Sequence, residues 1–359
     1  MNHAKDKFNK IKVLIVGSGI IGKSNAFKLS DTEFDITLVD QDEIHNSSNA
    51  ALGILMGKIY QKRKGRSWLL REKSSELWPQ WINILQSYNS KLRIEKPLFQ
   101  FTNDPVKFKK LTTFVNKYPH DDLEIIENNS NILNPINKIF KGNKLQGIIS
   151  HQDGRVNPRI LLETLNIALK KKNIKTINNR IIKIEKNKNK WNCKLKSGEI
   201  LVSEIVILCN SLDSLKLINQ EVYDIKLKPV LGQAVEIFHE EINNDFLSLP
   251  KLLNINGKNL ITLSKEKIII GSTDEYNFKP EEFYLNELFE FLENKPKWLN
   301  KKNITRKWFG IRSRPEGEPS PLLKSLDKGL ILCSGFYKNG ILLAPSCSHW
   351  ISEEIKKHI

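Results

Sequence analysis

The chain has 359 residues, a length that suits two interleaved domains. Hydrophobic residues make up 40% of it, and this apolar content excludes wholesale disorder. No apolar run approaches the roughly 18 residues of a membrane span, and residues 1–10 lack the apolar core of a secretory signal, so we expect a cytoplasmic protein without a membrane span. The formal net charge of +17 comes from lysines dispersed among asparagines and isoleucines, which is typical of a solvated surface, so nucleic acid is not expected as a partner.

The first predicted elements form a compact βαβ unit. Residues 12–16 are a run of valine, isoleucine and leucine typical of a buried parallel strand. A glycine-rich turn and a helix ending near Leu29 follow. A second strand at 35–39 leads directly to Asp40.

The remaining predicted elements alternate between helical and strand-like apolar periodicity. Apolar spacing favours a helix from 58 to about 92, and residues 58–71 within it form the densest basic cluster of the chain. Residues 96–147 mix short strand-like and helical pieces, and Pro158 begins a helix over 157–170. We expect strands at 176–185, 190–195, 200–208, 230–238, 267–271 and 330–333, and helices at 284–292 and from Asn339 onward. This alternation predicts two domains that the chain visits more than once.

The four cysteines, Cys193, Cys209, Cys333 and Cys347, are scattered and form no CxxC pair. That spacing excludes the usual disulfide frameworks and metal sites, so no metal is predicted. We expect each cysteine to be a small buried residue rather than a reactive thiol.

The glycine-rich turn has the spacing of a dinucleotide-binding loop. Gly17 permits a tight turn, Gly19 allows a pyrophosphate to approach the backbone, and Gly22 allows the helix to pack closely on the strand. The N-terminus of the helix favours phosphate, and Asp40 is placed to accept hydrogen bonds from a ribose. This context predicts dinucleotide binding but does not separate FAD from NAD.

Two further segments suit close approach to a cofactor. Residues 46–57 (NSSNAALGILMG) are small, and Ser47 and Ser48 are hydroxyl donors. Residues 308–312 (WFGIR) precede a strand, a glycine loop and a helix start at 335–345 (GFYKNGILLAP), which again aims backbone N–H groups at an anionic or carbonyl partner.

With these motifs the sequence resembles the D-amino acid oxidase superfamily, and within it the glycine oxidases of thiamine biosynthesis. The matching segments run in order from residue 12 to about 350: VLIVGSGIIG, NSSNAALGILMG, GRVNPRILLETL, LKPVLGQAVEI, IIIGST, WFGIR and GFYKNGILLAP. The resemblance implies a mixed α/β (α+β) fold with a discontinuous Rossmann-like FAD-binding domain, residues 1–90, 145–225 and 305–359. An antiparallel-sheet substrate domain, residues 91–144 and 226–304, is interleaved with it.

The resemblance also implies noncovalent FAD and a set of residues that hold it. Arg312 matches the arginine that binds a substrate carboxylate, and Lys338 would assist it. The expected cofactor-binding residues are Gly17, Ser18, Gly19, Ile20, Ile21, Gly22, Asp40, Gln41, Ser47, Ser48, Gly53, Ile54, Ile181, Gly310, Lys338, Asn339, Gly340, Ile341 and Leu342.

The reaction implied by the resemblance is oxidation of a C–N bond in glycine, sarcosine or a D-amino acid. Hydride passes to flavin N5, and the imine product hydrolyses. The electron acceptor is left open between O2, for an oxidase, and a quinone or carrier, for a dehydrogenase. Another reading is a flavoenzyme of the same fold that acts on the carboxymethylaminomethyl group of tRNA wobble uridine. A homo-oligomer and a non-catalytic FAD-binding subunit also stay open.

The sequence departs from the glycine oxidase pattern at positions that concern the substrate. Lys338 replaces an arginine, as in the sarcosine oxidase branch, and keeps the charge but loses the planar fork. Asp274 stands where glycine oxidases place an apolar residue. It is interpreted either as a group that holds a substrate ammonium or as a solvated loop carboxylate.

Overall fold

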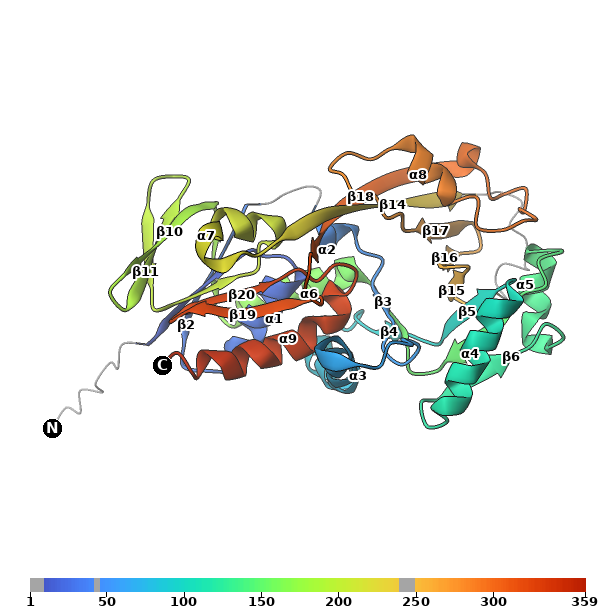
Figure 1. Ribbon diagram of the computed structural model, residues 1–359, viewed down its shortest axis with the longest axis horizontal. Helices are drawn as coiled ribbons and strands as arrows, with labels where there is room; N and C mark the ends of the chain where they lie inside the picture. The colour runs from blue at the N-terminus through green and yellow to red at the C-terminus, as the bar shows by residue number, and fades with distance from the viewer. Residues whose placement is uncertain (1–9, 42–45, 239–248) are drawn as a thin grey trace. The chain divides into compact units, whose positions relative to one another are not determined.

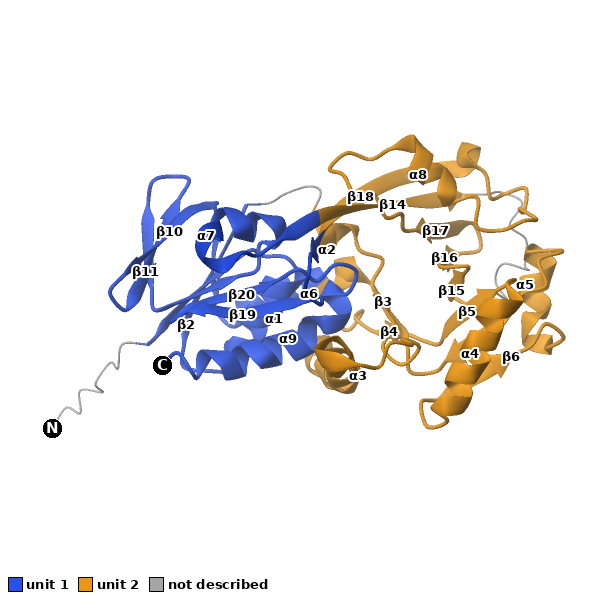
Figure 2. Ribbon diagram, in the orientation of Figure 1, with its two compact units in different colours: residues 1–44, 162–228, 313–359 blue, residues 45–161, 229–312 orange. Residues whose placement is uncertain are grey.

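The computed structural model describes residues 10–41, 46–238 and 249–359 (Figure 1). The chain forms two compact units, residues 1–44, 162–228 and 313–359 in unit 1 and residues 45–161 and 229–312 in unit 2 (Figure 2). The expected mixed fold of helices and sheets is confirmed. The predicted domains are defined by the ligand that each binds, FAD or substrate. The two compact units are defined by contacts within the chain, so they do not test the predicted bounds, which stay a prediction.

Unit 1 is built on a six-stranded sheet with the order β19-β20-β13-β1-β2-β9. The strands are β1 (Lys12–Val16), β2 (Asp35–Asp40), β9 (Lys175–Asn178), β13 (Ile205–Leu208), β19 (Leu322–Asp327) and β20 (Leu330–Ser334). All neighbours are parallel except β19, which pairs antiparallel with β20 at the edge. Strands β13 and β20 are buried along their whole length, as the continuous apolar runs of their sequences predict.

Two helices of unit 1, α1 (Ile20–Leu29) and α9 (Gly340–Ile355), pack against each other. A three-stranded antiparallel sheet is formed by β10 (Ile181–Asn187), β11 (Lys190–Leu195) and β12 (Ile200–Ser203). A 3-10 helix at Ser211–Lys216 precedes the short helix α7 (Gln220–Tyr223). Helix α6 (Pro158–Lys171) begins in residues of unit 2 and ends in residues of unit 1.

Two of the predicted strands are wrong, because each is two strands of different sheets. The run 176–185 is split into β9 and β10, and the N–H of Asn179 between them donates to the carbonyl of Asp40 (2.9 Å). The run 200–208 is split into β12 and β13, and the N–H of Glu204 between them donates to the carbonyl of Lys12 (3.2 Å). In both cases the N–H group between the two strands binds a neighbouring strand of the six-stranded sheet, at the point where the chain passes between the two sheets.

An eight-stranded sheet has the order β18-β14-β17-β16-β15-β5-β7-β6 and lies in unit 2, except that β14 begins and β18 ends in residues of unit 1. Unit 2 also contains a small sheet with the order β3-β8-β4. The strands of the large sheet are β5 (Leu98–Thr102), β6 (Leu123–Ile126), β7 (Gln146–Ser150), β14 (Leu227–Phe238), β15 (Leu252–Ile255), β16 (Lys258–Ser264), β17 (Lys267–Gly271) and β18 (Ile304–Pro315). The small sheet comprises β3 (Ile54–Leu55), β4 (Ile94–Glu95) and β8 (Gly154–Val156). The helices are α2 (Ser47–Ala50), α3 (Gly65–Gln86), α4 (Pro105–Lys117), α5 (Asn134–Ile139) and α8 (Glu282–Glu287).

No helix among residues 10–41, 46–238 and 249–359 combines the length and the apolar character that a membrane crossing requires. Of the four cysteines, Cys193, Cys333 and Cys347 are buried and Cys209 is half-buried. Burial raises the pKa of the Cys193 thiol to about 12, so that thiol stays protonated, as expected of an unreactive cysteine.

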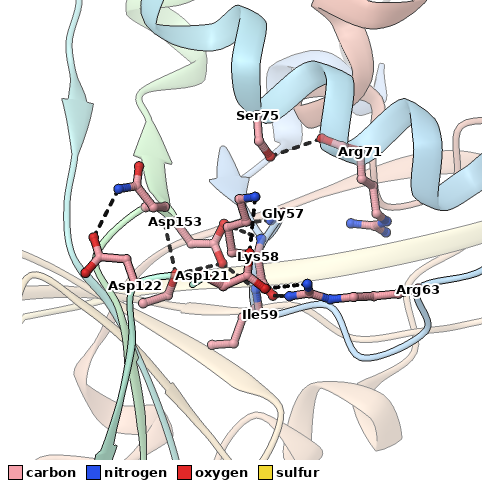
Figure 3. A network of polar contacts seen from close by, with 11 residues as sticks. Gly57, Lys58, Ile59, Arg63, Arg71, Ser75, Asp121, Asp122 and Asp153 are labelled. Carbon is pink, nitrogen blue, oxygen red and sulfur yellow. Dashed lines mark hydrogen bonds and ion pairs between the residues drawn. The ribbon is translucent and has the colours of Figure 1, made fainter. Parts of the chain in front are cut away.

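The helix predicted from 58 to about 92 is confirmed only over α3, because residues 57–59 bind a buried carboxylate instead (Figure 3). Asp153 is 3% exposed, and its Oδ1 accepts from the N–H groups of Gly57 (2.7 Å) and Lys58 (2.9 Å). Its Oδ2 accepts from the N–H of Ile59 (2.7 Å) and from Ser150 Oγ (3.0 Å). Burial raises the pKa of the Asp153 carboxyl, although these hydrogen bonds oppose the shift. Helix α8 is likewise shorter and earlier than the predicted 284–292.

We expect Asp153→Asn to lower the free energy of unfolding by about 2 kcal/mol, since an amide nitrogen would face a buried N–H donor and leave it unsatisfied. Urea denaturation monitored by circular dichroism measures the loss. Asp122→Asn is the control, because Asp122 is exposed and its carboxylate accepts from the side chain of Gln152 (Nε2 to Oδ2, 3.0 Å). Equal stability of the two variants would contradict an anchoring role for Asp153.

Candidate functional site

The glycine loop of unit 1 has no room for side chains. Gly17 has a φ of +103°, and a Cβ on it would lie 2.7 Å from the carbonyl carbon of Cys209. A Cβ on Gly22 would lie 1.7 Å from the carbonyl oxygen of Gly17. The loop is therefore pressed between β13 and the first turn of α1, as the dinucleotide-binding spacing predicts.

Asp40 lies beside this loop at the end of β2. Its Oδ2 accepts a hydrogen bond from the N–H of Ser18 (2.6 Å), and Gln41, the next residue, is half-buried. The carbonyl of Asp40 binds Asn179, two residues before Ile181, which is 4% exposed at the start of β10. The loop, the carboxylate and the start of β10, all expected to contact the adenosine half of a cofactor, therefore meet at one edge of the parallel sheet.

A second helix N-terminus lies at the same edge. Asn339 is the N-cap of α9, and Gly340, Ile341 and Leu342 form its first turn. A Cβ on Gly340 would be 3.7 Å from Cγ2 of Ile20, the first residue of α1. Two helix N-termini, including Ile20 and Ile21 in the first turn of α1, therefore lie together and favour an anionic or electron-rich ligand.

Lys338 precedes Asn339, the N-cap of α9, and is exposed, with its Nζ 5.3 Å from the centre of the Tyr337 ring. The N–H of Tyr337 donates to the carbonyl of Ser313 (2.9 Å), and Ser313 directly follows Arg312 in β18. Arg312 is the last residue of its segment in unit 2, whereas Lys338 belongs to unit 1.

In unit 2 the small-residue segment lies against strand β18. A Cβ on Gly310 would be 2.5 Å from Cβ of Ala50 and 3.2 Å from Cα of Ser47. Trp308 Nε1 donates to the carbonyl of Ala50 (3.1 Å). The contacts place α2, with Ser47 and the buried Ser48, directly on the strand that carries Arg312.

The chain then turns at Gly53, where φ is +83° and a Cβ would be 1.9 Å from the carbonyl oxygen of Val156. Ile54 begins β3 and pairs with Arg155 of β8. Gly53 and Ile54 are therefore part of the backbone that leaves α2, and their contact with a flavin stays a prediction.

Arg312 is held by three acceptors within unit 2. Its Nη1 donates to Asp274 Oδ1 (2.9 Å) and to the carbonyl of Thr273 (3.2 Å), and its Nη2 donates to Ser272 Oγ (2.6 Å). A Cβ on Gly232 of β14 would be 1.9 Å from Nη2, so the guanidinium packs directly against that glycine. The structure thus brings Arg312 and Asp274 together as an ion pair, a contact that sequence reasoning did not foresee.

Sequence reasoning also missed Glu275, whose exposed fraction is 0%. Its Oε1 accepts from Gln233 Nε2 (2.9 Å) and from Thr273 Oγ1, and its Oε2 accepts from the N–H of Glu281 (3.0 Å). A glutamate between polar neighbours in a short segment carries no sequence signal of burial. It fixes the segment that carries Asp274.

The basic cluster at 58–71 is only partly a solvated surface, because two of its arginines make internal contacts. Arg63 forms an ion pair with Asp121, and its guanidinium lies over three aromatic rings, those of Trp68, Phe114 and Tyr118, at 3.9–4.9 Å. Arg71 is 6% exposed and donates to the carbonyl of Met56 (2.8 Å). Both arginines hold unit 2 together internally.

Comparisons with known proteins agree with this geometry. A sequence model of the FAD dependent oxidoreductase family (DAO) matches residues 12–354. The structure is similar to glycine oxidase from Bacillus cereus ATCC 14579, with a TM-score of 0.83 and 19% identity over 98% of this chain and 96% of that one. No curated protein sequence matched.

Two further solved structures have the same fold. Iminodiacetate oxidase from Chelativorans sp. BNC1 has a TM-score of 0.80 and 14% identity over 97% of this chain and 96% of that one. L-alpha-glycerophosphate oxidase from Mycoplasma pneumoniae, solved with FAD bound, has a TM-score of 0.79 and 15% identity over 97% and 95% of the two chains.

Proposed function

Because the chain belongs to the family of FAD-dependent oxidoreductases, we propose that it oxidises the C–N bond of a small amino acid or secondary amine. The observation that carries this proposal is the fixed Arg312 guanidinium, two residues beyond the close contact of Gly310 with α2. A planar, oriented cation of this kind suits a substrate carboxylate. Glycine oxidases and an iminodiacetate oxidase share the fold.

The residues of unit 1 fit FAD. The loop at Gly17 and Gly22 is a cradle that a Cβ would fill, and the N–H groups at the start of α1 suit a pyrophosphate. Asp40 suits the adenosine ribose, Ile181 the adenine, and the start of α9 the pyrimidine edge of the ring. Ser47, Ser48, Gly53 and Ile54 of unit 2 would lie along the flavin. We propose that the flavin is held noncovalently.

When bound, FAD accepts the hydride of the substrate Cα–H bond, and the protein supplies binding and orientation. Arg312 would bind the carboxylate, with Lys338 as a second cation. Asp274 would face the amine end of the substrate. The imine product would then hydrolyse to an oxo acid and ammonia or an amine. Either O2 or a quinone-type carrier would reoxidise the cofactor.

A function on tRNA finds less support. It would use the basic cluster at 58–71 as a polyanion surface, and Arg63 and Arg71 of that cluster make internal contacts. Salt-sensitive tRNA binding that is lost on substitution of exposed Lys62 and Arg66 would reverse this ranking.

Anaerobic visible spectroscopy of the purified holoprotein tests the proposal. We expect a two-banded flavin spectrum that bleaches on addition of glycine, sarcosine or one of a panel of D-amino acids. A bound flavin that stays oxidised with every small amine would refute the proposed substrate class. Reoxidation on admitting air, compared with reoxidation by a soluble quinone, then identifies the acceptor.

A further inference from the structure

We propose that Asp274 determines charge specificity at Arg312, so that the site accepts substrates with one carboxylate and discriminates against substrates with a second one. This inference rests on the proposed function, in which Arg312 receives a substrate carboxylate. It concerns which amines are oxidised, and it follows from the ion pair between Asp274 Oδ1 and Arg312 Nη1 (2.9 Å).

The ion pair lies in a partly shielded place. The side chain of Arg312 is 14% exposed and that of Asp274 is 37% exposed. Charges in such a position are screened less by salt and water than charges on an open surface. The negative charge of Asp274 therefore affects any anion that approaches the guanidinium.

Asp274 is also fixed in place on both sides. The N–H of Thr273 donates to the carbonyl of Gln233 (3.2 Å), and the N–H and carbonyl of Glu275 exchange hydrogen bonds with Leu231 (2.9 and 2.7 Å). The buried Glu275 side chain adds its bonds to Gln233 and to the N–H of Glu281. Because its neighbours are tied to β14, Asp274 stays beside the guanidinium. A substrate carboxylate must share Arg312 with it.

The pair presents a positive and a negative group side by side with no net charge. A substrate with one carboxylate and one ammonium offers the complementary pair and adds no net charge to the site. Arg312 and, in the proposed function, Lys338 are engaged by the first carboxylate. A second carboxylate adds a negative charge that Arg312, already paired with Asp274, does not balance and that Asp274 repels. Sarcosine and iminodiacetate form a matched pair, since they differ by the carboxylate on the N-methyl carbon.

The test compares wild-type holoprotein with Asp274→Asn. Asparagine keeps an oxygen that accepts from Arg312 and removes only the charge. We expect wild-type protein to favour sarcosine over iminodiacetate in kcat/KM, and we expect that preference to fall at least tenfold in the variant. Glu282→Gln is the control for a general change of charge, because Glu282 is exposed on α8 and pairs with Lys301 (2.8 Å). Its preference should equal that of the wild type.

A binding titration separates this inference from the proposed function. Acetate and malonate are not oxidised, and their binding is followed by the change in flavin absorbance. We expect malonate to gain at least tenfold more affinity than acetate on Asp274→Asn. An equal change for both ligands, or none, would overturn the role of Asp274. If no amine reduces the flavin while the titration shows this charge dependence, the proposed reaction fails and the specificity role stands.

Discussion

Gly17→Ala is expected to yield a folded protein that has lost its FAD. An alanine at φ +103° costs about 1–2 kcal/mol in backbone strain. Its Cβ would also lie 2.7–2.8 Å from backbone atoms of Cys209 and Asn210, which cannot rotate away as a side chain would. The loop must move off β13, and its N–H groups then no longer converge on a pyrophosphate. The ratio of flavin to protein absorbance after purification should fall at least tenfold.

Gly198→Ala is a matched control for this experiment. Gly198 lies in the same unit and has a φ of +96°, but a Cβ on it would meet nothing within 4 Å. It bears the same backbone strain without the collision. We expect it to keep a full complement of FAD. A full complement of FAD in Gly17→Ala, equal to that of Gly198→Ala, would show that the close approach to Cys209 and Asn210 does not matter for cofactor binding.

The cradle could be predicted from the sequence because its determinants are local. The apolar run of β1, the glycine spacing and the strand that ends at Asp40 all lie within the first forty-odd residues, and each element formed where it was expected. The start of α9 was predicted for the same reason, since a glycine follows its N-cap Asn339. Local chemistry decides where such elements begin and end.

The missed features depend on partners far away in the chain. Residues 57–59 have helical periodicity, but their N–H groups bind Asp153. At the break between β9 and β10, the N–H of Asn179 binds the carbonyl of Asp40. The pairing of Asp274 with Arg312 likewise joins β18 to the segment after β17. A single sequence shows the residue types at these positions, but the fold decides which of them meet.

Arg312→Ala is expected to raise the apparent KM for an amino acid substrate by about 100-fold, the equivalent of about 3 kcal/mol. Two effects add. The variant loses the charge-assisted hydrogen bonds to the substrate carboxylate, and it leaves Asp274 without the guanidinium that neutralises it. The reacting C–N bond is not touched directly, so kcat should fall much less than kcat/KM.

Steady-state kinetics of three variants separate these effects. Arg306→Ala is the control, because Arg306 is an exposed arginine of the same strand, 4.8 Å from the centre of the Trp308 ring, and KM should stay within about twofold of wild type. The double variant Arg312→Ala with Asp274→Asn should recover about tenfold of the lost affinity, since the unpaired carboxylate is gone. An unchanged KM in Arg312→Ala would remove Arg312 from the substrate site. A KM that rises without any recovery in the double variant would mean that Arg312 binds substrate independently of Asp274.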